Sequence, residues 1–104
     1  MKGFHITSDK GFHITFENGY TVSVQFGPGN YCDNYERQIG QDERACGKEG
    51  SRTAECAVWA AARDLIVYEG FNGNTVGNRM TPAEVLTLMN WAASQPKEVT
   101  CPAT

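Results

Sequence analysis

The chain has 104 residues, of which 40% are hydrophobic and 20% charged, and its formal net charge is −3. This length suits one domain with one modest core, and the hydrophobic content is that of a folded protein rather than a disordered one. The negative net charge opposes binding of long DNA or RNA through a broad basic surface, because such binding requires Lys and Arg side chains that neutralise many phosphates. We expect a single domain over residues 1–104, with a duplicated segment at 1–9 and a C-terminal tail at 95–104.

The sequence shows no targeting or membrane signal. Its start lacks the continuous apolar stretch of a signal peptide, and no run of about 18 apolar residues occurs in it. We therefore expect a cytoplasmic protein that does not enter a membrane. The cysteines Cys32, Cys46, Cys56 and Cys101 form no Cys-x-x-Cys pair. We expect reduced thiols, with a Cys32–Cys46 disulfide as the alternative.

The N-terminus carries a short duplication, in which Lys2–Thr7 (KGFHIT) recurs letter for letter as Lys10–Thr15. This period is far below the 20–50 residues of solenoid repeats. A turn over Asp9–Gly11 would pair the apolar residues of the two copies, Ile6 with Ile14 and Phe4 with Phe16. The first copy is then an extra edge strand, and the alternative is a frayed tail.

Apolar and polar residues alternate in the next two segments, with Asn18-Gly19 between them, which predicts a hairpin. A two-residue Asn-Gly loop would leave the two apolar sets on opposite faces. A three-residue loop, Glu17–Gly19, with Gly19 in the left-handed conformation, puts both sets on one face. The predicted pairs are Phe16 with Tyr20, Ile14 with Val22, and Phe12 with Val24.

A long polar and glycine-rich connection follows over residues 27–52, with one helical turn expected near 34–39. Loops of this length are usually functional or mobile. The next stretch, Thr53–Tyr68, is ambiguous, because its alanines favour a helix whereas Leu65–Tyr68 favours a strand. We predict a second hairpin that turns near Ala61–Asp64 and reject a helix over 53–65.

The C-terminal helix is the best-marked element. Thr81-Pro82-Ala83-Glu84 combines an N-cap Thr, a Pro at the first helical position and a Glu at N3, which is a capping box. Gln95-Pro96 ends the helix. Its apolar face, predicted to pack on the sheet, consists of Val85, Leu88, Met89 and Ala92. The expected fold class is α+β, an antiparallel sheet of two hairpins packed by this C-terminal helix.

The segment Gly27–Tyr35 has the residue types of a ligand-binding turn. Its glycines let a ligand approach the backbone closely. Tyr31 and Tyr35 offer stacking faces, and Asn30 and Asn34 can hydrogen-bond a polar edge. The competing interpretation is a turn that packs its own tyrosines, since turns favour these residue types in any case.

A second candidate segment, Phe71–Met80, leads into the N-terminus of the predicted helix, a position that attracts anions. Asn78 and Arg79 lie closest to it, and the Arg79 guanidinium can hold a phosphate or a carboxylate. The competing interpretation is a solvated arginine in a polar connection.

A catalytic role for Cys32, with His5 or His13 as its base, is poorly supported. No Cys/His family signature surrounds these residues, and an unactivated thiol is a weak nucleophile. We therefore assign no catalytic residue, no metal ligand and no cofactor. The missing acid/base pair favours a binding protein over an enzyme.

Two runs of sequence, NGYTVSVQFGPGNYCDN over Asn18–Asn34 and GSRTAE over Gly50–Glu55, resemble a family of small phage-encoded proteins without assigned function. The likeness covers residues 10 to 92, and the duplicated Met1–Asp9 departs from the pattern.

The resemblance implies an accessory binding protein in the cytoplasm of an infected bacterium. Its partner would be a host defence protein that it blocks or a small nucleotide-like ligand that it sequesters. The alternatives are a virion-associated structural accessory and a small enzyme. An exposed strand edge would also let copies pair into a homo-oligomer.

Overall fold

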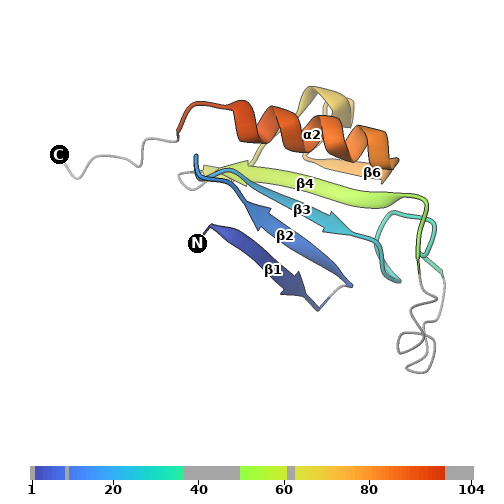
Figure 1. Cartoon of the computed structure of the whole chain (residues 1–104). Coiled ribbons are helices and arrows are strands. Elements are labelled where there is room, and N and C mark those ends of the chain that lie inside the picture. The colour runs from blue at the N-terminus through green and yellow to red at the C-terminus, as the bar shows by residue number, and fades with distance from the viewer. Residues whose placement is uncertain (1, 9, 37–49, 61–62, 98–104) are drawn as a thin grey trace.

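The computed structural model of the protein describes residues 2–8, 10–36, 50–60 and 63–97. One antiparallel sheet is packed on one face by a C-terminal helix (Figure 1). The predicted α+β class is therefore confirmed. Among the described residues, no helix is long and apolar enough to cross a membrane.

The sheet has six strands, in the order β1-β2-β3-β4, with β5 and β6 both paired to the outer edge of β4. A short 3-10 helix, η1 (Glu69–Phe71), precedes β6, and α2 (Pro82–Ser94) follows it. The strands are β1 (Gly3–Thr7), β2 (Gly11–Thr15), β3 (Thr21–Gln25), β4 (Ala54–Ala60), β5 (Arg63–Leu65) and β6 (Val76–Met80).

The hairpin between β2 and β3 has the predicted register, with Ile14 opposite Val22. Its loop is the predicted Glu17–Gly19. The Gly19 N–H donates to the Phe16 carbonyl at 2.9 Å, and Gly19 has a φ of 90°. Both apolar sets therefore lie on one face, which is the constraint that favours this loop over a two-residue one.

The first copy of the duplicated segment forms the edge strand β1 and not a frayed tail. Its predicted register was wrong by two residues. Ile6 lies opposite Phe12 and not Ile14. Phe4 correspondingly lies opposite Ile14 and not Phe16. The apolar residues keep their face, because a shift of two residues preserves the side of the sheet.

The position of the turn explains this correction. Thr7 pairs with Gly11, so Gly11 belongs to β2 and not to the turn. A Cβ at Gly11 would come within 2.1 Å of the Val24 carbonyl oxygen, so the close approach of β3 requires glycine there. Lys10 takes the left-handed position instead, with a φ of 66°, which is uncommon for a residue with a side chain.

Strands β4 and β5 form the predicted second hairpin, and the helix over 53–65 is absent. Ala60 pairs with Arg63, so β5 begins within the predicted turn, whose residues 61–62 lie outside the described ones. The predicted strand to Tyr68 was too long, since β5 ends at Leu65. Beyond it, the Ile66 N–H still donates to the Val58 carbonyl at 2.8 Å.

Strand β6 was not predicted, because the segment before α2 was interpreted as a polar connection. Gly77 lies opposite Cys56 and Met80 lies opposite Ala54, so β6 uses one residue more than β4 over this stretch. Such an extra residue is a β-bulge. Arg79 lies in it with a φ of 49°, and the bulge breaks the alternation that normally marks a strand.

Helix α2 begins and ends where predicted. The Thr81 N–H donates to Glu84 Oε1 at 2.9 Å, and the Glu84 N–H donates to Thr81 Oγ1 at 3.3 Å, which closes the capping box. Pro82 stands in the first turn, and Gln95 is the C-cap. The helix is therefore bounded by local sequence signals.

The helix packs on the central strands. Val85, Leu88 and Ala92 are buried and Met89 is partly buried, as predicted for this face. Full burial of one leucine, such as Leu88, stabilises the fold by about 1.5–3 kcal/mol. The buried sheet residues of the same core cluster are Val22 and Val24 of β3 and Cys56 and Val58 of β4.

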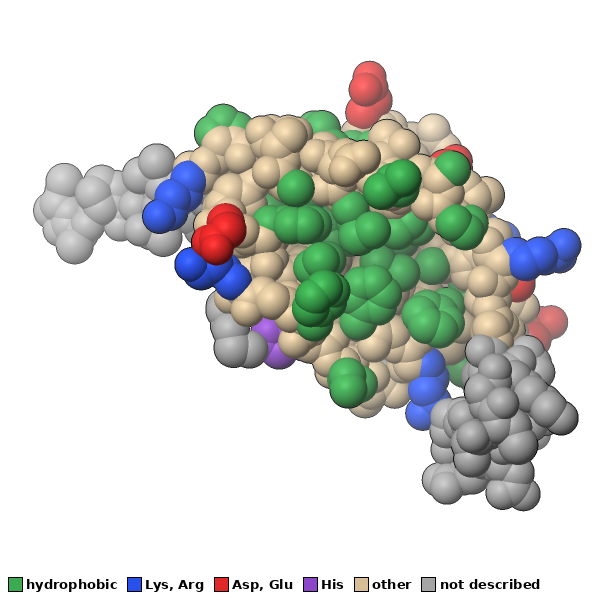
Figure 2. All heavy atoms as spheres, in the orientation of Figure 1, with side chains coloured by type: hydrophobic (Ala, Val, Ile, Leu, Met, Phe, Trp, Pro, Cys, Tyr) green, Lys and Arg blue, Asp and Glu red, His purple; other side chains and the backbone are tan. Residues whose placement is uncertain are grey.

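The helix leaves part of its face of the sheet uncovered. Phe12 and Ile14 of β2 are partly buried, whereas Phe4 and Ile6 of β1 are 75% and 96% exposed. We call these four residues the open apolar patch. Figure 2 shows apolar side chains gathered between α2 and the outer part of the sheet.

One buried amide links the first hairpin to the end of the helix. Asn18 is 9% exposed. Its Nδ2 donates to the carbonyls of Ala92 and Gln95 at 2.7 and 2.8 Å, and its Oδ1 accepts from the Tyr20 N–H at 3.0 Å. The last carbonyls of a helix have no partner within the helix, so Asn18 satisfies groups that burial would otherwise penalise.

We expect Asn18→Ala to lower the free energy of unfolding by about 1–3 kcal/mol, because it removes the side-chain donor to the Gln95 carbonyl and one of the two donors to the buried Ala92 carbonyl. This loss should lower Tm by roughly 4–8 °C per kcal/mol in a domain of this size. The matched control is Asn90→Ala on the exposed face of α2, which should change stability little. Equal thermal shifts for the two variants would contradict the role of Asn18.

Candidate functional site

The two segments that the sequence singles out as site candidates contact each other at one end of the sheet. The Arg79 N–H donates to the Tyr31 carbonyl at 2.8 Å. Arg79 Nη1 also lies 3.0 Å from Asp33 Oδ1, although the two residues are 46 positions apart. These contacts hold the loop that follows β3 against the bulge of β6.

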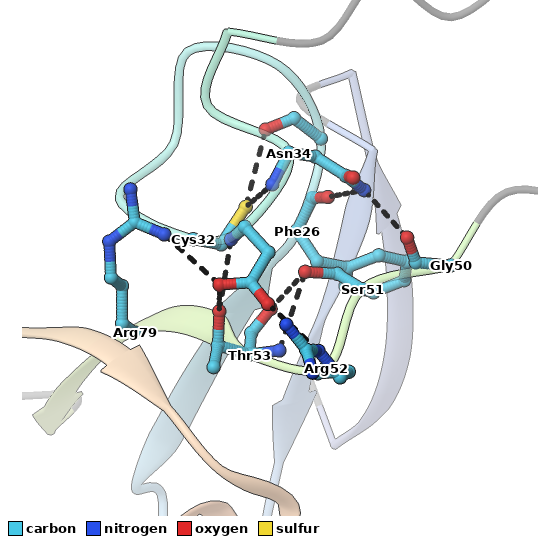
Figure 3. A network of polar contacts seen from close by, with 10 residues as sticks. Phe26, Cys32, Asn34, Gly50, Ser51, Arg52, Thr53 and Arg79 are labelled. Carbon is cyan, nitrogen blue, oxygen red and sulfur yellow. Dashed lines mark hydrogen bonds and ion pairs between the residues drawn. The ribbon is translucent and has the colours of Figure 1, made fainter.

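The Asp33 carboxylate organises this contact. Its Oδ1 accepts from Thr53 Oγ1 at 2.9 Å as well as from Arg79. Its Oδ2 lies 3.4 Å from Arg52 Nε. The Asp33 N–H donates in turn to Thr53 Oγ1 at 2.9 Å. Figure 3 shows Arg52 and Thr53, which are adjacent in the chain, converging here with Arg79 of β6.

The hydrogen bond from Thr53 is the main cause that lowers the pKa of Asp33, and the charge of Arg52 and the hydrogen bonds from Arg52 and Arg79 add to it. Asp33 is therefore ionised at neutral pH. Glu55 Oε1 also accepts from the Tyr31 N–H at 3.1 Å, so two carboxylates stand against the two guanidinium groups at this contact. Both arginine side chains are mostly exposed, at 94% and 57%, so each keeps N–H groups that can reach a ligand.

The same loop carries an exposed aromatic pair. The rings of Tyr31 and Tyr35 stack with centroids 5.4 Å apart and an interplanar angle of 4°. The two residues are 51% and 42% exposed. The tyrosines thus pack on each other, as the competing interpretation expects, and still present flat aromatic surface to solvent. We call Tyr31, Tyr35, Arg52 and Arg79, together with Asp33 and Thr53, the tyrosine–arginine cluster.

Of the predicted site asparagines, Asn34 supports the loop from inside. It is 4% exposed, and its Nδ2 donates to the carbonyls of Phe26 and Gly50 at 2.8 and 3.0 Å (Figure 3). Asn30 Nδ2 donates to the Gly27 carbonyl within the turn at 3.2 Å. Asn78, by contrast, is exposed beside Arg79. The side-chain amide groups of Asn30 and Asn34 therefore fix the loop conformation.

An open pocket of about 430 Å³ adjoins the cluster and shares Arg52 and Thr53 with it. Most of its other walls are apolar, and they come from β2, the end of β3 and the start of α2. The side chains that form them include Phe12, Phe26, Met80, Val85 and Met89. A ligand at the cluster can therefore place an apolar group here while an anionic group meets Arg52.

The cysteines take no part in this site. Cys32 is a free and fully buried thiol among the described residues. The alternative of a Cys32–Cys46 disulfide stays a prediction, because it involves a residue outside the described ones. Its Sγ donates to the Gly27 carbonyl at 3.6 Å and accepts from the Asn34 N–H at 3.4 Å. Cys56 is also free, and burial raises its thiol pKa to about 12. Cys46 and Cys101 lie outside the described residues.

The histidines lie on the opposite face of the sheet. His5 and His13 are cross-strand partners, and the His13 ring meets the Trp59 ring edge-on with centroids 5.0 Å apart. Burial and then the neighbouring His5 lower the pKa of His13. Among the described residues, no three His, Cys, Asp or Glu side chains converge as metal ligands would.

Sequence reasoning missed three members of this arrangement, namely Asp33, Arg52 and Thr53. Asp33 stands beside a candidate thiol in the sequence, and Arg52 and Thr53 stand where the long loop rejoins the sheet. None has a spacing that marks a known motif. Their proximity depends on how the loop folds back, which no local pattern encodes.

We predict that the Asp33 charge stabilises the fold in a pH-dependent way. Because folding lowers its pKa, Asp33 contributes fully above its ordinary pKa of about 4, and the contribution is lost as pH falls through the lowered value. Denaturant unfolding, followed by tryptophan fluorescence, should therefore show wild type more stable than Asp33→Asn at neutral pH. This difference should shrink as the solution is acidified below about pH 4. A difference that stays constant into acid would contradict the ionic role.

Comparison with known protein families, with curated proteins and with solved structures finds no match for this chain. The function of the site is therefore inferred from its own chemistry. The exposed tyrosines, the two guanidinium groups and the neighbouring apolar pocket are the features on which that inference depends.

Proposed function

We propose that the protein is a non-enzymatic binding protein whose tyrosine–arginine cluster takes a small, nucleotide-like ligand. Such a ligand combines a flat aromatic ring with a phosphate group. The observation that carries the proposal is the exposed Tyr31–Tyr35 stack, set in the same loop as the carboxylate that orients two arginines.

The aromatic half of the ligand would stack on a tyrosine. Aromatic side chains bind bases through their flat faces, and each stacked base is worth about 1–3 kcal/mol by alanine substitution. Tyr31 and Tyr35 are already parallel, at 4°, so little side-chain freedom is lost on binding. Their shared orientation supports a platform for a planar ring.

The anionic half would meet the guanidinium groups. Arginine binds phosphate through paired, charge-assisted hydrogen bonds. Asp33 holds Arg79 at 3.0 Å and Arg52 at 3.4 Å, which orients both groups before a ligand arrives. The exposed guanidinium N–H groups of both arginines are all donors, which supports an anion rather than a cation as the ligand.

Binding fits this arrangement better than catalysis does. Asp33 is held ionised by Thr53 and the arginines, so it is a poor general acid, and its oxygens are already engaged as acceptors. Cys32 is buried within its own turn. The groups nearest the cluster therefore support recognition of a ligand, through aromatic faces and guanidinium N–H groups.

The resemblance to small phage-encoded proteins suggests the biological setting of this binding. In an infected bacterium, a protein that takes up a nucleotide would act against defence by sequestering a small nucleotide signal. A second candidate is direct blockage of a host defence protein. The open apolar patch supports it, because large exposed apolar surfaces often mark protein interaction sites.

We predict that adenosine 5′-monophosphate or a cyclic dinucleotide binds the purified protein, measured by native mass spectrometry and by calorimetry. Tyr31→Ala should weaken binding about 5- to 150-fold, because it removes one stacking face. Arg79→Ala should weaken it as well. Tyr31→Phe keeps the ring and should bind nearly as wild type does, and Lys97→Ala removes an exposed cation outside the cluster.

The comparison among variants decides the proposal. Normal binding by both Tyr31→Ala and Arg79→Ala, with folding intact by circular dichroism, would show that the cluster is not the site. A protein that binds none of these nucleotides but captures a host polypeptide, in a manner sensitive to Phe4→Ala, would favour the second candidate.

A further inference from the structure

Among the described residues, no strand pairs with the outer side of β1, and this open edge differs from the usual protected edge strand. Natural edge strands are commonly guarded by prolines, bulges or inward-pointing charges. Gly3–Thr7 contains neither proline nor charge, and it pairs with β2 without a register shift. Its two large apolar residues, Phe4 and Ile6, are 75% and 96% exposed.

The hydrogen bonds of β2 show which backbone N–H and C=O groups of β1 point away from the sheet. At the two ends of the β2–β3 ladder, the Phe16 N–H donates to the Tyr20 carbonyl and the Phe26 N–H donates to the Lys10 carbonyl. Since hydrogen-bonded pairs alternate along an antiparallel ladder, the even-numbered residues of β2 bond to β3 and the odd-numbered ones to β1. His5 of β1 therefore bonds inward.

The backbone N–H and C=O groups of Phe4 and Ile6 consequently point away from β2, to the open side. Because β1 repeats the sequence of β2, this open edge is the same edge that β2 uses, through Phe12 and Ile14, to bind β3. The same sequence therefore already pairs with a strand through this edge within the fold, in strand β2.

The molecule also shows which strand suits it. Strands β1 and β2 are two copies of one sequence, GFHIT, paired antiparallel with Phe4 opposite Ile14 and His5 opposite His13. The sequence is therefore complementary to itself, since its two Phe–Ile pairs each set an aromatic against a β-branched residue, a favourable cross-strand combination. Any second copy of β1 presents the same sequence again.

We infer that the protein forms a symmetric dimer in which β1 pairs antiparallel with β1 of a second copy. The pairing has the register of the β1–β2 pair, with Phe4 opposite Ile6 of the partner and His5 opposite His5 of the partner. Even-numbered residues supply the hydrogen bonds, so the two His5 residues form a non-hydrogen-bonded pair on the twofold axis.

In this dimer the two sheets join into one, and both α2 helices lie on the same side of it. The open apolar patches of the two copies then meet at the axis, so that Phe4 and Ile6 gain neighbours that they lack in one copy. The interface is a strand pair and little more, so we expect association in the micromolar range rather than an obligate dimer.

A cysteine placed on the axis tests the register directly. In a non-hydrogen-bonded pair the Cα atoms are about 4.5 Å apart, within the range that a disulfide spans. Under mild oxidation, His5→Cys should link two copies through position 5, identified by mass spectrometry in the tryptic peptide Gly3–Lys10. The matched control is Ser8→Cys, which faces Lys2 of the partner and should not link.

Sedimentation velocity over a micromolar to millimolar series tests the dimer without a covalent link. Ile6→Lys should raise the dissociation constant about tenfold or more, because it removes both symmetric Phe4–Ile6 pairs. Leu86→Lys is the matched control, since Leu86 is an exposed apolar residue of α2, 56% exposed, away from this edge. Circular dichroism checks that each variant is folded.

Three results would overturn the inference. One is a wild-type protein that stays monomeric throughout the concentration series. Another is disulfide formation as rapid for Ser8→Cys as for His5→Cys. The third is equal weakening of the dimer by Ile6→Lys and Leu86→Lys, which would indicate non-specific association of exposed apolar side chains instead of strand pairing.

Discussion

The rest of this structure depends on one constraint, which is that a single helix is too narrow to cover the whole face of the sheet. A helix with its side chains is about 10–12 Å across, and neighbouring strands lie about 4.8 Å apart, so one helix covers roughly two strands. Here α2 is the one helix that the described residues place on a sheet of six strands. The core accordingly forms where α2 meets β3 and β4, and the apolar residues of β1 and β2 receive little cover. The open apolar patch and the pocket beside α2 follow from this mismatch.

The tyrosine–arginine cluster is held together by polar contacts, whereas the rest of the fold is held together by an apolar core. The loop after β3 has few apolar residues to bury, and Asn34 inside it and Asp33 on its surface provide the fixed points. Asp33 holds together three segments that are distant in the sequence, and in doing so it orients two guanidinium groups against the loop that carries the two stacked rings. The interactions that order the loop are thus the ones that prepare it to recognise an anionic aromatic ligand.

The sequence predicts those parts of the fold that local rules determine. The Glu17–Gly19 loop followed from the need to place two apolar sets on one face, and the start of α2 followed from the Thr81–Glu84 capping box. The predictions failed where a distant contact decides the local conformation. The close approach of β3 requires glycine at position 11 within β2, so the left-handed residue of the first turn is Lys10. The bulge in strand β6 interrupts the alternation of apolar and polar residues that predicts a strand. The same bulge brings Arg79 to Asp33. The tyrosines and Arg79 were named from their residue types, whereas Arg52 and Thr53 join the cluster only through the folded loop.

The central claim is that a nucleotide-like ligand binds on the tyrosine–arginine cluster, and NMR titration of isotope-labelled protein tests it most directly. The Arg79 amide is a built-in reporter, since it donates to the Tyr31 carbonyl at 2.8 Å and must respond to any ligand that moves either residue. The account predicts that added nucleotide shifts the amide signals of Arg79, Tyr31 and Tyr35 in a saturable way and leaves those of Phe4 and Ile6 unchanged. Signals of the cluster that stay fixed at saturating nucleotide, or shifts confined to β1 and β2, would contradict it.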